Sequence, residues 1–501
     1  MVDPAGAEPA YPAAHDAVRV AFRRVFPGVM VAMFLAAIDQ TVLASALPQI
    51  ASHLGGLADV SWVVVAYLLA ATVAAPIYGH LGDRYGRKRM LLVALAVFTA
   101  ASALAGCADS LVTLTAARAL QGAGGGGLMT LAQALIGEAV PPRERGRFQG
   151  YFAAIFALSS ASGPVIGGYL SELLTWRAVF WVNLPLGAIA AGLATMIPAQ
   201  APRPHVADAP IDYAGVALFA ASTLSLMVLL TSGGHRFEWL SGWGLVLATV
   251  AVAGGVALIL WEWRAAEPLI PVRLLVTPAL RRTTIVVMLF ATAMFAAILY
   301  LPLYLQIGHS VGMGTSGLAL LPLTLAMVGS STAAGRLINK TGRTKPFPIA
   351  GLAMASAMFL ALSVTIEARS TPLVLGLTMG VGCGLGMVMP ANQIVVQTLA
   401  GRSRLGAATA SISLARSIGG ALGVAVAGAL LFHLFGRDPS TADLMSHLME
   451  GGARYLATLA PDVQARTLAA LDGAFSAIFR MASLACLAGA LIATIIPPTR
   501  L

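Results

Sequence analysis

The chain has 501 residues, of which 58% are hydrophobic and only 10% charged, and its mean hydropathy is +0.83. Soluble proteins contain about 25% charged residues, so most of a surface this poor in charge must face lipid. The composition excludes a soluble, disordered or coiled-coil protein. The net charge of +10 is explained by loop charges that set membrane orientation, and we expect no nucleic-acid partner.

Apolar runs of bilayer-spanning length recur along the whole chain, since a helix needs about 20 apolar residues to cross. They predict fourteen helices near residues 24–48, 61–80, 90–107, 110–136, 148–171, 176–198, 213–232, 243–262, 282–305, 315–336, 347–366, 372–395, 405–433 and 473–496. The first run has no small-residue cleavage site close behind it, so we expect it to stay as the first helix. Residues 1–21 are expected to form a cytoplasmic tail ahead of it.

Basic residues are distributed unevenly between the predicted loops. Alternate loops, counted from the N-terminal tail, contain 22 of the 31 Lys and Arg residues. Because basic loops remain in the cytoplasm, this asymmetry predicts a multi-pass protein of the cytoplasmic (inner) membrane with both termini cytoplasmic.

Sequence motifs of enzymes and of metal or cofactor sites are missing. The only lysines, Lys88, Lys340 and Lys345, do not complete a phosphate-binding G-x-x-x-x-G-K-[ST] loop, and no G-x-S-x-G or H-E-x-x-H motif occurs. The three cysteines have neither metal-ligand nor disulfide spacing. We therefore expect no enzymatic activity, no metal and no cofactor.

A repeat relates the two halves of the chain. Residues 79–87 (GHLGDRYGR) and 335–343 (GRLINKTGR) share Gly, Leu, Gly and Arg at an offset of 256. Gly-rich stretches that begin at Gly122 and Gly380 agree at an offset of 258. The repeated loops fall on the same side of the membrane, so the halves are predicted to be parallel repeats related by an axis along the membrane normal.

The predicted fold is an all-α polytopic membrane protein with two pseudo-symmetric six-helix bundles. Residues 22–198 and 282–501 form the bundles, and residues 199–281 form a linker with two additional helices. The longest outer loop, at about 436–472, carries apolar residues at broadly helical spacing, which indicates short amphipathic helices or, alternatively, a poorly ordered loop. These apolar residues are Leu444, Leu448, Tyr455, Leu456, Leu459 and Leu468.

Ionisable side chains are rare within the predicted spans, where they are functional by default. Asp39 in the first helix and Arg118 in the fourth both lie about 13 Å below the outer boundary, so they can pair directly or through water. Burial favours the neutral carboxyl and a neighbouring Arg favours the carboxylate, which suits either a proton-coupled step or a static ion pair. Arg416, in the thirteenth predicted helix, can attract an anion or extend to a carbonyl.

The loop after the second predicted helix, residues 79–89, is the strongest local signal. Gly79 and Gly82 permit close backbone approach, Gly86 permits a tight turn, and Asp83 can face the positive end of a neighbouring helix. The basic residues hold the loop in the cytoplasm and can form ion pairs between the bundles. They are Arg84, Arg87, Lys88 and Arg89. The segment therefore predicts close packing and ion pairs between the bundles, with an ordinary positive-inside loop as the alternative.

These features together resemble the major facilitator superfamily, and within it the fourteen-helix drug:proton antiporters. The resemblance covers nearly the whole chain, and residues 79–89 match the superfamily's gating motif in full. Other similar segments are Asp39 to Pro48, Trp62 with Tyr67 and Leu68, Arg118 to Gly122, Pro142 to Gly146, Trp176 to Gly187, Asp212 to Gly215, Glu267 to Leu269 and Tyr300 to Gln306. Ala44 and Ser159 depart from the pattern, where Asn and Gly are usual.

The fifth predicted helix contains Gly163-Pro164-x-x-Gly167-Gly168, which is similar to the antiporter motif of that family. As a small-residue face it is flexible, kinked or simply a packing surface.

The resemblance also implies a substrate cavity near the membrane midplane, between the two bundles. Its candidate lining residues are Phe34, Gln121, Met129, Asn183, Tyr300, Tyr304, Met387, Asn392 and Arg416. For the aromatic and Met side chains, packing in the core or against lipid is the alternative interpretation.

The implied function is proton-coupled antiport that exports lipophilic drugs or toxic small molecules by alternating access. The proton gradient is the energy source, and Asp39 and Arg118 are the expected proton-coupling residues. The scarcity of membrane acids favours monovalent or neutral substrates, with anions left open because of Arg416. The expected partners are a lipophilic small molecule, protons and the bilayer, and the sequence leaves open whether periplasmic adaptor proteins also bind. The protein is expected to be a monomer. A dedicated metabolite exporter or facilitator, or a non-transporting membrane sensor, is the alternative.

Overall fold

The computed structural model describes most of the chain between residues 21 and 497. The described ranges are 21–54, 60, 62–141, 144–198, 212–233, 237–265, 269, 277–308, 320–366, 370–401, 405–435, 455–456 and 458–497. Helices dominate them, and the β structure within these ranges is an isolated bridge between Gly233 and Phe237.

The helices form three groups along the chain. The first comprises η1 (Ala21–Val25), α2 (Phe26–Leu54), α3 (Trp62–Tyr85), α4 (Arg87–Gly106), α5 (Leu111–Ala139), α6 (Arg145–Leu173), α7 (Ala178–Trp181) and α8 (Asn183–Thr195). The second comprises α10 (Tyr213–Ser232) and α11 (Gly242–Arg264). The third comprises α13 (Pro278–Gly308), α15 (Leu321–Thr341), α16 (Pro346–Val364), α17 (Thr371–Gly386), α18 (Val388–Ala400), α19 (Leu405–Phe435) and α22 (Pro461–Thr494).

Every predicted span overlaps a helix, which confirms an all-α polytopic fold. The predicted helices 176–198 and 372–395 are each interrupted, into α7 and α8 and into α17 and α18. In the described residues, 11 helical segments are long and apolar enough to cross a membrane, so the total of fourteen crossings stays a prediction.

Helix α22 begins earlier than expected, at Pro461, within the predicted outer loop. Proline suits the first turn of a helix, because the amide it lacks has no partner there. Leu456 is buried in the core of the second bundle, and Tyr455, Leu459 and Leu468 pack against it. Leu444 and Leu448 lie outside the described residues.

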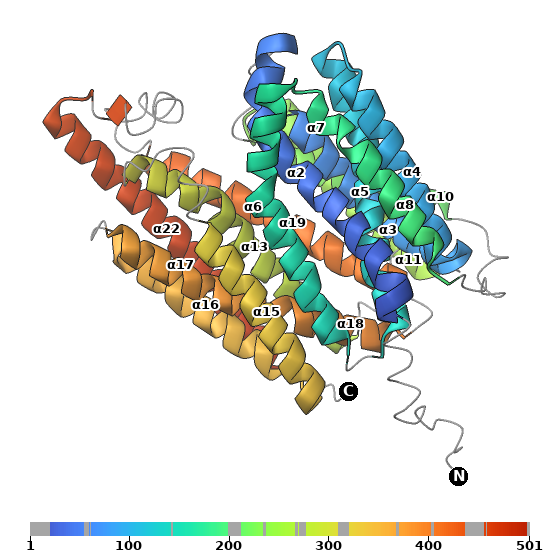
Figure 1. The fold of residues 1–501 in the computed structure, drawn as a ribbon. Coiled ribbons are helices and arrows are strands. Elements are labelled where there is room, and N and C mark those ends of the chain that lie inside the picture. Colours follow the sequence, from blue (N-terminus) through green and yellow to red (C-terminus); the bar gives the residue numbers. More distant parts are fainter. Residues whose placement is uncertain are drawn as a thin grey trace.

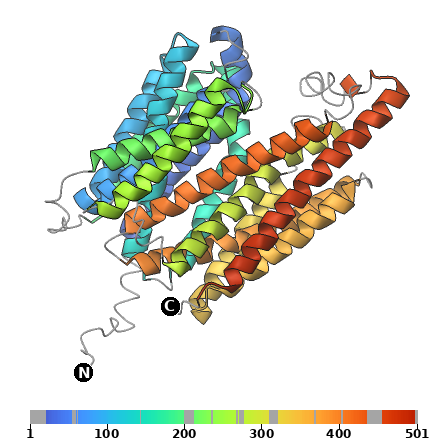
Figure 2. The same ribbon diagram turned by 180° about the vertical axis from the view of Figure 1, so that it is seen from behind.

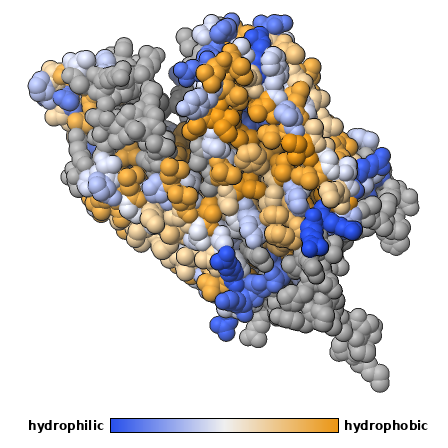
Figure 3. Space-filling model, viewed as in Figure 1, coloured by the Kyte–Doolittle hydropathy of each residue, from blue (hydrophilic) through white to orange (hydrophobic). Residues whose placement is uncertain are grey.

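The first and third groups form two separate bundles, each with its own apolar core (Figures 1 and 2). The pair α10 and α11 lies alongside, where Phe219 and Leu258 contact Val73 and Ile77 of α3 and Leu414 of α19. Helix α11 exposes most of its apolar side chains, and apolar residues cover much of the visible surface (Figure 3). Exposed apolar area on this scale fits a bilayer environment.

The repeat is visible in the turns that follow α3 and α15. Gly86 and Gly342, separated by the predicted offset of 256, both adopt positive φ, at 94° and 66°. Only glycine adopts such a conformation without strain, so each turn requires it.

The Gly-rich stretches are also equivalent, but in a different register from the predicted one. Gly122 of α5 packs on the backbone of Tyr67, and Gly382 of α17 packs on the backbone of Leu323. Tyr67 and Leu323 are themselves 256 residues apart, whereas the two glycines are separated by 260. The sequence offset of 258 was therefore wrong by two residues, because which glycine meets the neighbouring helix depends on helix rotation.

The bundles meet at the end of the molecule where α2 begins and α22 ends, and they diverge toward the opposite end (Figure 1). We call the meeting point the gate end; it contains the turns at Gly86 and Gly342. There Gly79 of α3 packs against Gly406 of α19, and Gly150 of α6 packs against Thr332 of α15.

Candidate functional site

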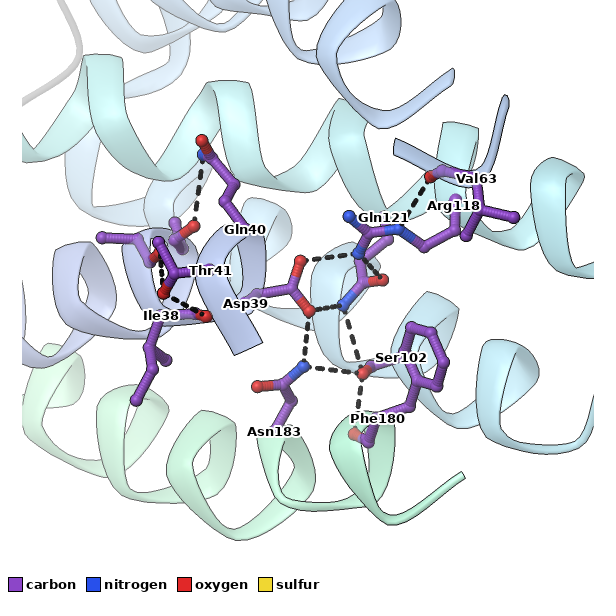
Figure 4. A network of polar contacts seen from close by, with 12 residues as sticks. Ile38, Asp39, Gln40, Thr41, Val63, Ser102, Arg118, Gln121, Phe180 and Asn183 are labelled. Carbon is purple, nitrogen blue, oxygen red and sulfur yellow. Dashed lines mark hydrogen bonds and ion pairs between the residues drawn. The ribbon is translucent and has the colours of Figure 1, made fainter. Parts of the chain in front are cut away.

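A buried polar network joins α2, α4, α5 and α8 inside the first bundle (Figure 4). The Asp39 carboxylate is its centre. Oδ2 accepts a hydrogen bond from Nη1 of Arg118 at 2.6 Å, and Oδ1 accepts from Nε2 of Gln121 and Nδ2 of Asn183, both at 2.8 Å. The side chains of Asp39 and Arg118 are 0% and 1% exposed. The ion pair predicted from equal membrane depth is therefore present and direct.

The remaining contacts hold this pair in one geometry. Arg118 also donates to the carbonyl of Val63 at 3.2 Å and to Oε1 of Gln121 at 2.7 Å. Ser102 accepts from Gln121 and Asn183 and donates to the carbonyl of Phe180. A buried ion pair is favourable only when its other hydrogen-bonding groups are satisfied, so this network keeps both charges within the apolar bundle.

Ser102 was missed by the sequence analysis, because serine within an apolar helix is common. The sequence had assigned Gln121 and Asn183 to the substrate cavity, and the structure places both in the network. For Gln121 a signal existed, since residues three apart share a helix face and Gln121 follows Arg118 by three positions.

A central cavity of about 350 Å³ lies between the bundles. It is lined by α2, α3, α5 and α6 of the first bundle and by α13, α15, α17, α18 and α19 of the second. Tyr67 connects it to the buried network, because its side chain lines the cavity while the Cζ of Arg118 lies 4.3 Å from its ring centroid.

Of the candidate cavity residues, Met129 and Arg416 line this space. The expectation for the others is corrected. Phe34 packs against the core of its own bundle, and the hydroxyls of Tyr300 and Tyr304 donate to the carbonyls of Val424 and Ile366. The two tyrosine hydroxyls are thus satisfied inside a bundle, and none of the three side chains lines the cavity.

Two further candidates from the second bundle lie near the interruption of the predicted span 372–395. Met387 occupies the break between α17 and α18 and packs near Gly351, and Asn392 is buried in α18. Neither lines the cavity.

Residues 79–89, predicted as a loop, are instead the last turns of α3 and the start of α4, separated at Gly86, and this segment joins the two bundles at the gate end. Both carboxylate oxygens of Asp83 accept hydrogen bonds from backbone amides at the start of α19, those of Gly406 and Ala407, at 3.1 Å. This is the contact expected of Asp83, since the first amides of a helix are unpaired and carry partial positive charge. Arg87 forms ion pairs with Asp83 and Glu138, and so fixes the carboxylate from within the first bundle.

Other residues of this segment also support close packing. A Cβ atom on Gly82 would clash with Leu131, and Arg84 is buried. Lys88 differs from the prediction of an inter-bundle ion pair, because its amine donates to the carbonyls of Thr195 and Ile197, at the end of α8 in its own bundle. Within this segment, Asp83 and Gly79 contact α19 of the second bundle.

The antiporter-like motif packs α6 against α2. A Cβ atom on Gly163 would overlap Thr41, and one on Gly167 would overlap the carbonyl of Val42, whereas Gly168 has open space. Pro164 lies in α6 between them. The motif therefore brings the backbones of α6 and α2 together next to Asp39. Gly163 and Gly167 make this contact, and Gly168 does not.

Gly167→Ala should lower the stability of the purified protein by about 1–3 kcal/mol, the usual cost of overpacking. The added methyl group must push α6 away from the backbone of α2. Gly168→Ala is the matched control and should leave stability unchanged or raise it, because helices favour Ala. Thermal unfolding in detergent measures both, and equal melting temperatures would contradict the close contact.

Two pseudo-symmetric helical bundles around a central cavity define a polytopic membrane protein of the transporter class. The family model of the Major Facilitator Superfamily matches residues 29–424, and the chain belongs to this superfamily. The resemblance seen in the sequence is confirmed.

Relatives are similar over most of this chain. The multidrug transporter protein MdtP of Bacillus subtilis is 35% identical over 407 residues, which cover 81% of this chain and 74% of MdtP. An uncharacterized MFS-type transporter of Mycobacterium tuberculosis is 35% identical over 421 residues, covering 83% of this chain; the match spans only 61% of that relative's length.

Solved structures share the fold at low sequence identity. The proton:xylose symporter XylE has a TM-score of 0.63 at 12% identity, with 97% of each chain covered. The human organic anion transporter MFSD10 has a TM-score of 0.62 at 17% identity, with 93% of this chain and 99% of that chain covered.

Proposed function

We propose that this protein is a proton-coupled antiporter that exports lipophilic small molecules across the cytoplasmic membrane by alternating access. The observation that carries the proposal is the fully buried Asp39–Arg118 pair, which lies directly behind a cavity between two bundles. The names of relatives such as MdtP support export of drugs. Both termini and the gate end are assigned to the cytoplasm, in agreement with the distribution of basic residues.

The coupling step is a proton exchange at Asp39. Protonation removes the negative charge that balances Arg118, and a buried Arg without its counter-ion is unfavourable. The guanidinium must then move or recruit another acceptor. Because Arg118 rests on the ring of Tyr67, such a movement reaches the cavity wall.

Direct competition between proton and substrate for Asp39 is not part of this mechanism. The Asp39 side chain is 0% exposed and does not line the cavity, and both its oxygens already accept hydrogen bonds. The proton therefore acts on the bundle geometry, and the gate at Asp83 and α19 opens and closes as the bundles rock.

Purified protein in proteoliposomes tests the function. With an imposed pH gradient, lipophilic substrates should move against the direction of proton flow, and adding substrate should change the internal pH reported by a trapped dye. A facilitator would move substrate at the same rate with and without the gradient. A non-transporting sensor would bind compounds but move none of them.

A further inference from the structure

We propose that the central cavity binds lipophilic monoanions and that Arg416 is the residue that recognises their negative group. This inference rests on the proposed export function and adds the chemical class of its substrate. It is carried by the charge of the cavity wall and by the surroundings of one arginine.

The charge on the described part of the cavity wall is of one sign only. Among the described residues that line it, Arg416 is the single charged side chain, and no Asp or Glu is present. Asp39 directly precedes the lining residues Gln40 and Thr41, but its carboxylate is turned into the polar network (Figure 4). A cationic substrate in this cavity would therefore meet a like charge without a compensating acid.

Arg416 has no polar partner among the described residues, in contrast to Arg118. No hydrogen bond, ion pair or ring contact holds its guanidinium, whereas Arg118 has three polar partners. The five N–H donors of the Arg416 guanidinium therefore open onto the cavity, where they are available to an acceptor on a ligand. A bound anion would pair with these donors and with the positive charge, so this part of the cavity wall favours negative charge.

The depth of Arg416 makes extension to the membrane surface a poor alternative. It lies 11 residues after the start of α19 at Leu405, which is about 17 Å along the helix axis. That is more than the reach of an arginine side chain. Its side chain instead lines the cavity.

The surroundings of Arg416 define the remaining chemistry of the ligand. Ser413 and Ser417 of the same helix also line the cavity and can donate hydrogen bonds to an anion held by the guanidinium. Aromatic side chains from α6 and α13, among them Phe152, Phe156 and Phe290, line the same space. A planar carboxylate or sulfonate on an aromatic or aliphatic body would satisfy both regions, because guanidinium binds such groups through two parallel hydrogen bonds.

Three probes that share one apolar body test the inference: 1-naphthylacetate, 1-naphthylacetamide and 1-naphthylmethylamine. Binding to the purified chain and pH-driven transport in proteoliposomes are both measured. The wild type should bind and export the carboxylate best. Arg416→Gln should weaken binding of the carboxylate about 10- to 100-fold, as expected for a lost charged hydrogen bond, and leave the neutral amide unchanged. Arg416→Lys should bind the carboxylate with an affinity between those of the wild type and of Arg416→Gln.

Arg480→Gln is the matched control, because it removes an exposed arginine of α22 that lies outside the cavity. It should behave as the wild type with all three probes. Membrane potential gives a second readout. An anion leaving and a proton entering both move positive charge inward, so an inside-negative potential should accelerate export of the carboxylate more than that of the amide.

The outcomes separate the inference from the proposed function. If the carboxylate binds through Arg416 but no probe moves with the pH gradient, the function is wrong and the anion site remains. If transport is pH-driven but Arg416→Gln handles the carboxylate as the wild type does, the anion site is wrong and the function remains. Preference of the wild type for the amine, or failure to bind the carboxylate, overturns the inference as well.

Discussion

Asp39→Asn should abolish pH-driven export while substrate binding in the central cavity persists. Asparagine has nearly the same shape but cannot exchange a proton at neutral pH, and it leaves Arg118 without a counter-ion. Binding should survive because Asp39 does not line the cavity. A mechanism in which substrate and proton compete for this carboxylate predicts loss of both, so the two measurements distinguish the mechanisms.

Stability must be controlled in this experiment, because breaking a buried ion pair costs about 3–5 kcal/mol. The double variant Asp39→Asn with Arg118→Gln removes both charges and should recover much of the lost thermal stability. It should nevertheless remain uncoupled. Recovery of pH-driven export in the double variant, or its retention in Asp39→Asn, would show that Asp39 is a static structural residue.

Gly79→Leu should prevent closure of the gate end and lower transport by more than about tenfold. In the closed gate a Cβ atom on Gly79 would lie 2.7 Å from the carbonyl oxygen of Gly406, and 3.1 Å from the Cβ of Ala410. Both obstacles belong to α19, whose backbone cannot yield without moving the second bundle. The population should therefore shift to states in which the bundles are apart at the gate end.

Spin labels at Tyr85 and Thr341, on opposite bundles of the gate end, report this shift after the native cysteines are replaced. Gly79→Leu should lengthen the distance distribution between them. Gly329→Leu is the matched control, because this glycine of α15 has open space around it, and both distance and transport should match the wild type. An unchanged distance in Gly79→Leu would mean that the gate opens by another contact.

Much of the site could be predicted because some properties depend only on position along a helix. Asp39 and Arg118 were placed at one depth by counting residues, and depth is preserved whatever the rotation of each helix. The turn at Gly86 and the helix-facing role of Asp83 follow from local chemistry, since a positive φ requires glycine and an unpaired helix start attracts a carboxylate.

The assignment of side chains to the cavity could not be predicted in the same way. Gln121 and Met129 belong to one helix, yet Gln121 enters the buried network and Met129 lines the cavity. In a chain with so few polar residues, both faces of a helix are apolar, so hydropathy does not tell which face meets the cavity, the core or lipid. Tyr300 and Tyr304 were misassigned for this reason.

The low charge content of the sequence by itself determined that this is a lipid-embedded helical protein and singled out its few membrane charges. Only the tertiary structure decided what each charge does. Arg118 is neutralised by Asp39 from another helix, and Arg416 faces a cavity whose described walls hold no acid. Pairing of a charge depends on helix rotation and on neighbours distant in sequence, and packing alone sets both.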